Sequence, residues 1–157
     1  MNADRLRLAI FLIVIAFSTS ILSAAIATSA MNIDGVNIDV TAVERKGSVL
    51  TLKFAVKNSG TKTATVQFAL TGDKVTTYLV DEESGTKYYV LTDKEGNSLA
   101  TEHDYTGSSY GISEYVEAGA TKRFWAKFPA PPAAVKTINI MFSQAEPVED
   151  APITDKK

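Results

Sequence analysis

The residue best suited to acid–base chemistry is the single histidine, His103, which stands between Glu102 and Asp104. A neutral imidazole is a good general base near neutral pH, and Ser108 or Ser109 could supply a nucleophilic hydroxyl. Adjacent carboxylates in a strand or loop point in different directions, however, so neither is well placed to orient the imidazole. We therefore expect an ordinary loop histidine and no catalytic residue. A small hydrolase centred on His103 is the least favoured alternative.

Three oxygen-bearing side chains alternate at Asp93, Glu95 and Asn97, a spacing that could place ligands around a hard cation such as Ca²⁺. The run departs from the EF-hand loop, because Gly96 precedes Asn97 and the twelfth position holds Asp104 in place of a glutamate. Asp, Gly and Asn also favour tight turns for backbone reasons alone. We expect a turn and no metal or other cofactor here, with Ca²⁺ as the alternative. Zinc is excluded on ligand chemistry, since the chain has one His and no Cys.

Consecutive carboxylates occur at Asp81, Glu82 and Glu83. Glycoside hydrolysis needs two carboxyl groups on opposite sides of a bond, about 5–10 Å apart. Neighbouring residues at the tip of a hairpin are poorly placed for this, so we expect a solvated turn.

Aromatic residues give the main candidate for a binding surface. If Phe124 and Phe128 face the core, strand alternation puts Trp125 on the opposite face. The same alternation puts Tyr78 on the face opposite that of Thr77 and Leu79. Exposed Trp and Tyr side chains are favoured at binding hot spots. The candidate surface comprises Trp125, Tyr78, Tyr105 and Tyr110. The alternation alone leaves open the opposite arrangement, with Trp125 inside.

The N-terminal segment has the three parts of a secretory signal. Arg5 and Arg7 precede an apolar run, Leu8 to Phe17, and small residues follow as far as Ala30. We expect residues 1–30 to be a signal and the protein to be extracytoplasmic, either periplasmic or secreted. The alternative is an uncleaved anchor, because residues 8–27 carry no charge and about 20 apolar residues can span a bilayer.

The composition limits the remaining function classes. Without residues 1–30 the basic residues fall from 16 to 14 and the acidic ones from 18 to 17, so the net charge moves from -2 to -3. A mildly acidic chain without a Lys/Arg cluster lacks the electrostatic footprint of a nucleic-acid-binding protein. The absence of cysteine excludes a thiolate nucleophile and a lipid-accepting Cys.

The elements that must position these residues are strands, because apolar residues recur with period two in several separate runs. Turn-forming Gly, Asn and Asp residues separate these runs. We predict an all-β, immunoglobulin-like antiparallel β-sandwich of seven or eight strands over residues 31–145, and an extended or disordered tail over 146–157. A barrel is the alternative. The predicted strands cover 36–40, 50–56, 64–70, 76–81, 88–91, 97–101, 122–128 and 137–142.

Four runs in the later half also carry a family resemblance: Tyr78 to Asp81, Gly85 to Tyr88, Asp93 to Asn97, and Phe124 to Pro132. Together they resemble small exported bacterial immunoglobulin-like domains and are similar to the telokin-like domains of unknown function. The resemblance covers residues 36–153 and implies an extracytoplasmic interaction module without catalytic residues. The chain lacks the cysteine-anchored lipoprotein start that many such proteins carry.

We therefore expect a non-catalytic interaction or scaffold domain at the cell envelope, with another envelope protein as partner. The alternative is a membrane-tethered accessory subunit, in which residues 8–27 are retained as a transmembrane helix. A membrane contact is expected only in that case.

Overall fold

The computed structural model describes residues 24–71, 75–101 and 111–157, which form eleven β-strands and no helix. The strands are β1 (Ala27–Ala30), β2 (Val36–Lys46), β3 (Val49–Asn58), β4 (Ala64–Ala69), β5 (Tyr78–Asp81), β6 (Thr86–Tyr88), β7 (Gly111–Val116), β8 (Thr121–Pro129), β9 (Thr137–Met141), β10 (Val148–Pro152) and β11 (Thr154–Asp155).

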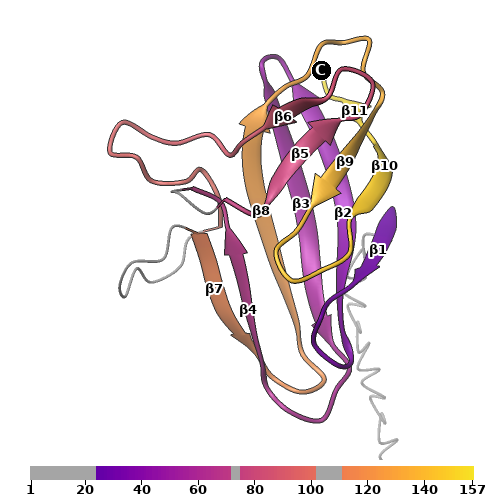
Figure 1. Cartoon of the computed structure of the whole chain (residues 1–157), viewed down its shortest axis with the longest axis vertical. Helices are drawn as coiled ribbons and strands as arrows, with labels where there is room; N and C mark the ends of the chain where they lie inside the picture. The colour runs from indigo at the N-terminus through magenta and orange to yellow at the C-terminus, as the bar shows by residue number, and fades with distance from the viewer. Residues whose placement is uncertain (1–23, 72–74, 102–110) are drawn as a thin grey trace, which may run out of the picture.

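These strands form a sandwich-like arrangement of antiparallel sheets. One sheet has the order β1-β2-β3-β8, and a second has the order β10-β9-β5-β6. Strands β4 and β7 pair with each other at one end of the molecule (Figure 1). One added pairing is parallel, that of the short β11 with β2. The predicted all-β, antiparallel class is confirmed.

The core lies between the sheets and is built by the two-residue alternation of β3 and β8. Phe54 on β3 is the register partner of Phe124 on β8, and both point inward. Phe54 also lies 5.1 Å, between ring centroids, from both Phe68 of β4 and Phe142 after β9. Such aromatic pairs add about 0.5–1.5 kcal/mol beyond the area they bury. This cluster therefore joins all three sheets.

A β-bulge in β2 explains why two different strands share one edge of this strand. The register passes from Val40↔Phe54 to Ala42↔Lys53, so Thr41 is the extra residue. A bulge reverses the side-chain phase and bends the strand. Strand β1 pairs with β2 before the bulge, and β11 pairs with it after the bulge, at Glu44 and Arg45.

The C-terminal strand β11 is fastened by the buried side chain of Arg45, which is 5% exposed. Its Nε donates to Asp155 Oδ1 at 2.6 Å. Its Nη1 donates to the carbonyl oxygens of Pro132 at 2.8 Å and Val135 at 3.1 Å. A buried charge is tolerated only when its donors are satisfied, and here one guanidinium joins β2, the loop after β8 and β11.

Most predicted strands are confirmed, but the predicted strand over 97–101 is wrong, because only isolated bridges form there, at Ser98 and Ala100. Strands also occur outside the limits of 31–145 predicted for the β-sandwich. Residues 27–30, assigned from the sequence to the exit of the signal, form β1. The tail over 146–157, expected to be extended or disordered, contains β10 and β11, and both are held by pairing with other strands. The second arm of the predicted hairpin lies at Thr86–Tyr88, two residues earlier than expected. Strand β7 was not predicted.

Predictions that concern residues 1–23, 72–74 and 102–110 lie outside the described residues. These include the apolar run Leu8 to Phe17. Among the residues that the structure describes, no helix has the length and apolar character needed to cross a membrane.

Candidate functional site

Trp125 lies on the outer face of the β1-β2-β3-β8 sheet. It is 36% exposed, whereas its neighbours Phe124 and Ala126 are 4% and 1% exposed. Strand alternation, with Phe124 packed in the core, fixes this orientation. The alternation left two arrangements open, and the structure has the one with Phe124 in the core and Trp125 outward.

Cationic side chains surround the indole. Arg123 and Lys127 precede and follow Trp125 by two positions on β8, which places them on the same face. The Nζ atom of Lys127 lies 5.5 Å from the indole centroid, within reach of a cation–π interaction. Lys53 of β3 is the register partner of Trp125. The pattern Arg-x-Trp-x-Lys was present in the sequence, but these cations were not singled out.

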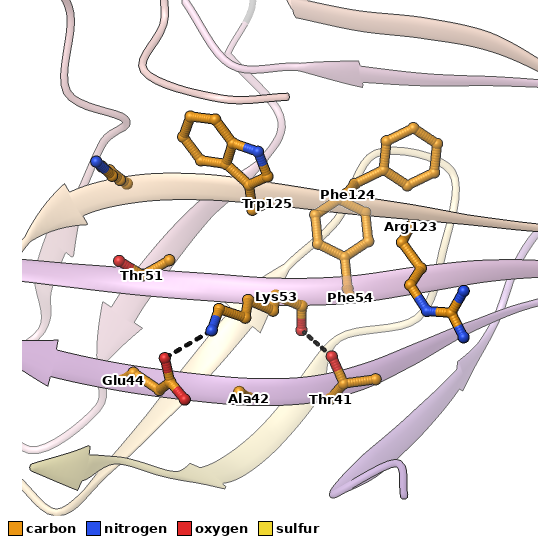
Figure 2. A pocket seen from close by; sticks show the side chains of 10 residues that line it. Thr41, Ala42, Glu44, Thr51, Lys53, Phe54, Arg123, Phe124 and Trp125 are labelled. Carbon is orange, nitrogen blue, oxygen red and sulfur yellow. Dashed lines mark hydrogen bonds and ion pairs between the residues drawn. The ribbon is translucent and has the colours of Figure 1, made fainter. Parts of the chain in front are cut away.

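The side chains around Trp125 enclose a shallow groove of about 580 Å³, seen from close by in Figure 2. Short side chains also line the groove, namely Thr51 of β3 and, beyond it, Thr41 and Ala42 of β2. Arg123 extends from β8 across β3 toward β2 (Figure 2). We call this surface the Trp125 face. Its residues are Thr41, Ala42, Glu44, Thr51, Lys53, Arg123, Trp125 and Lys127, and the groove is also lined by Phe54 and Phe124, whose rings belong to the core.

Glu44 is the carboxylate of the Trp125 face, and it is already paired. Its Oε2 lies 2.8 Å from Lys53 Nζ, and its Oε1 lies 3.3 Å from Lys156 Nζ. The hydrogen bond from Lys53 holds the pKa of Glu44 below its usual value, although partial burial acts in the opposite direction. Glu44 therefore stays ionised at neutral pH and neutralises Lys53 more than it neutralises Arg123.

The edge of β8 that does not pair with β3 is covered, beside Trp125, by residues 91–101. The amide of Lys127 donates to the carbonyl of Leu99 at 2.8 Å, and the amide of Leu91 donates to the carbonyl of Lys127 at 2.8 Å. The amide of Thr101 donates to the carbonyl of Trp125 at 2.8 Å. A ligand of the Trp125 face must therefore lie on the sheet and not along this edge.

Tyr78 does not share this face, because it belongs to β5 in the other sheet. Its ring centroid lies 5.8 Å from that of Tyr89, and Lys87 Nζ lies 4.9 Å from the Tyr78 centroid. The expected alternation holds there, since Leu79 is buried while Tyr78 is half-buried. Tyr105 and Tyr110, the other members of the candidate surface, lie outside the described residues.

The Asp93 run forms the turn that backbone chemistry predicts. Asp93 Oδ1 accepts from the amides of Glu95 at 3.0 Å and Asn97 at 2.8 Å, and Oδ2 accepts from Asn97 Nδ2 at 2.9 Å. These bonds, chiefly those from Asn97, lower the pKa of Asp93. The amide group of Asn97 thus presents a donor to Asp93. Among the described residues, no three His, Cys, Asp or Glu side chains gather to hold a metal.

The remaining chemical candidates are dispersed. Asp81 is nearly buried and accepts from Ser84 Oγ at 2.6 Å within the hairpin, while Glu82 accepts from Asn139 Nδ2 at 3.1 Å. His103, Ser108 and Ser109 lie outside the described residues.

Residues 107–111 read Gly-Ser-Ser-Tyr-Gly, the spacing of a nucleophile elbow. That motif requires a helix after the serine, whereas Gly111 begins the strand β7. The sequence around Ser109 therefore matches the motif in spacing, and the element that follows it does not match.

Comparisons with protein-family models, curated proteins and solved structures give no match.

Proposed function

We propose that this chain is an exported, non-catalytic binding domain of the cell envelope, with an immunoglobulin-type β-sandwich fold, and that it binds its partner through the Trp125 face. The basic and apolar N-terminal pattern supports export. The strand pattern and the resemblance to telokin-like domains support the immunoglobulin type.

The observation that carries the proposal is the exposure of Trp125 within a groove. An exposed Trp supplies a large, rigid contact area with a polar handle, and Trp125 presents it on a sheet face among cations. Trp and Arg are the residue types most enriched at binding hot spots, and here they stand two positions apart. A binding face accounts both for the exposure of Trp125 and for the nearby Arg123.

Site-specific crosslinking in the native host tests the proposal. We would replace Trp125 with the photoreactive residue benzoylphenylalanine in the full-length chain. The matched control carries the same residue at Tyr115, which is 68% exposed on β7. We expect a discrete higher-mass adduct from position 125 and none from position 115. The same adducts from both positions, or none from position 125, would remove the Trp125 face as the binding surface.

A membrane-tethered accessory subunit is the second candidate, and the position of β1 favours it. Strand β1 spans Ala27–Ala30, so cleavage after Ala27 would cut into this paired strand and cleavage after Ala30 would remove it. Retention of the apolar run would leave β1 whole.

Mass spectrometry of the native protein distinguishes the two candidates. A membrane-fraction protein that retains Met1 supports the tether. A mature N-terminus near residue 24 supports export with cleavage ahead of β1.

A further inference from the structure

The Trp125 face carries an excess of positive charge that the chain as a whole lacks. Arg123, Lys127 and Lys53 line it together with one carboxylate, Glu44, while the whole chain has a formal net charge of -2. Lys53 donates to Glu44 at 2.8 Å, so its charge is largely neutralised. Within residues 24–71, 75–101 and 111–157, neither Arg123 nor Lys127 forms an ion pair. The face is therefore complementary to a ligand with negative charge.

The spacing of these groups describes the shape of that ligand. Residues two apart on a strand are separated by roughly 7 Å, so Arg123 and Lys127 leave β8 on either side of Trp125, and the Arg123 side chain runs from there across β3 (Figure 2). Arg123 can also grip a planar carboxylate through two parallel hydrogen bonds. A ring that covers the indole, with carboxylates toward both ends, would use all three side chains at once.

The covered edge of β8 argues against a peptide that binds as an added strand. Peptides often bind sheets by adding a strand to a free edge. Residues 91–101 occupy that edge beside Trp125, so a ligand must rest on the face of the sheet. Nucleic acids need a larger cationic surface than two unpaired cations provide. A chain of sugar rings has an apolar C–H face that can stack on an exposed indole.

We infer that the Trp125 face binds an acidic polysaccharide, with the indole of Trp125 under one uronic acid ring and with Arg123 and Lys127 contacting carboxylates along the chain. The inference rests on the proposed function, because it names the ligand of that same face. Lys53 and Glu44, already paired, form the wall of the groove on the β2 side.

Fluorescence titration tests the inference, because Trp125 is the only tryptophan of the chain. We would titrate the full-length chain with tetragalacturonate, and in parallel with a neutral glucose tetrasaccharide. We expect a saturable change with the acidic sugar alone, and weaker binding at higher salt. Arg123→Gln and Lys127→Gln should each weaken binding about three- to tenfold.

Lys122→Gln is the matched control for these variants. Lys122 is a neighbouring cation on the same strand, but its Nζ lies 2.6 Å from Glu114 of β7, away from the Trp125 face. Its substitution should leave the affinity unchanged. Trp125→Ala, which removes the fluorophore, is measured by retardation in gels that contain polygalacturonate, after circular dichroism has verified the fold. We expect this variant to lose retardation.

Several results would overturn the inference. They are equal binding of the neutral sugar, unchanged affinity in Arg123→Gln, and equal affinity for anionic vesicles or single-stranded DNA. The outcome also separates this inference from the proposed function. Crosslinks from position 125 without glycan binding would reject the polysaccharide and retain the binding face, whereas absence of both would reject both.

Discussion

Single residues on β8 divide sharply into those that hold the fold and those that face solvent. Phe124 packs against Phe54 and Phe68 in the core, and the next residue, Trp125, projects into the groove. A truncation to alanine should therefore have very different consequences at the two positions.

We predict that Phe124→Ala lowers the free energy of unfolding by about 3–5 kcal/mol, because it leaves a cavity in the core. Trp125→Ala should change it by less than about 1 kcal/mol, since surface substitutions have small effects. Urea denaturation followed by circular dichroism measures both. A loss of several kcal/mol in Trp125→Ala would show that the indole supports the core.

Arg45 is the residue whose stability role was least visible in the sequence. Arg45→Met should lower the free energy of unfolding by about 2–4 kcal/mol, because the carbonyls of Pro132 and Val135 lose their donor. Arg123→Met, an exposed arginine on the same sheet, is the control and should stay within about 0.5 kcal/mol. Equal effects of the two substitutions would contradict a stabilising role for the hydrogen bonds of buried Arg45.

The partner of Arg45 predicts a pH dependence. The hydrogen bond from Arg45 holds the pKa of Asp155 below its usual value of 3.8. A lowered folded-state pKa contributes stability that is fully present above 3.8 and is lost as the pH falls through the folded value. Asp155→Asn should therefore flatten this part of the curve of unfolding free energy against pH. Identical acid limbs in both proteins would contradict the assignment.

At the scale of elements, β2 depends on both ends of the described chain. Strand β1 covers its edge before the bulge, and Ser29 of β1, almost fully buried, donates to the carbonyl of Glu146. We predict that a chain beginning at residue 31 is less stable than one beginning at residue 24 by about 2–4 kcal/mol, because several ladder hydrogen bonds are lost. Thermal unfolding of the two chains measures this difference, and equal midpoints would contradict it.

The strands that sequence reasoning found are those with long apolar alternation, such as β3 and β8. The strands that the sequence did not predict form for other reasons. Strand β1 consists of small residues that also fit a signal exit, and β11 has two residues that are held by distant Arg45. Alternation likewise put Trp125 and Phe124 on opposite faces of β8, but it did not settle which of them faces outward and could not bring Lys53 beside Trp125. That contact depends on the register of β3 with β8.

The bulge at Thr41 shows, within one strand, that alternation cannot predict effects of strand pairing. Val36, Ile38 and Val40 predict the inward face correctly, but after the extra residue Val43 and Arg45 take that face. A period of two cannot reveal a shift of phase, because the shift arises from pairing with β3. The sequence therefore predicted the start of β2 and not its length.

At the scale of the whole molecule, charge is distributed unevenly between two of the sheets. The Trp125 face on one sheet is cationic, whereas a second groove, formed by β9, β10 and the β5–β6 turn, is lined by four carboxylates, Asp81, Glu82, Glu83 and Asp150, and one cation, Lys136. Such separation steers an anionic ligand toward one side of a protein whose net charge is itself negative. We therefore predict that the surroundings of Trp125 favour anions over cations.

Quenching of the fluorescence of Trp125 by ions of opposite charge tests this claim most directly. At low ionic strength and neutral pH, we express quenching by each ion relative to its quenching of free N-acetyltryptophanamide. On this scale iodide should quench the native full-length chain at least about twofold more strongly than caesium, because the surrounding cations concentrate anions near the indole. Arg123→Gln should reduce this preference, and Lys122→Gln should preserve it. Equal quenching by both ions, stronger quenching by caesium, or protection from both would contradict an exposed indole in a cationic face.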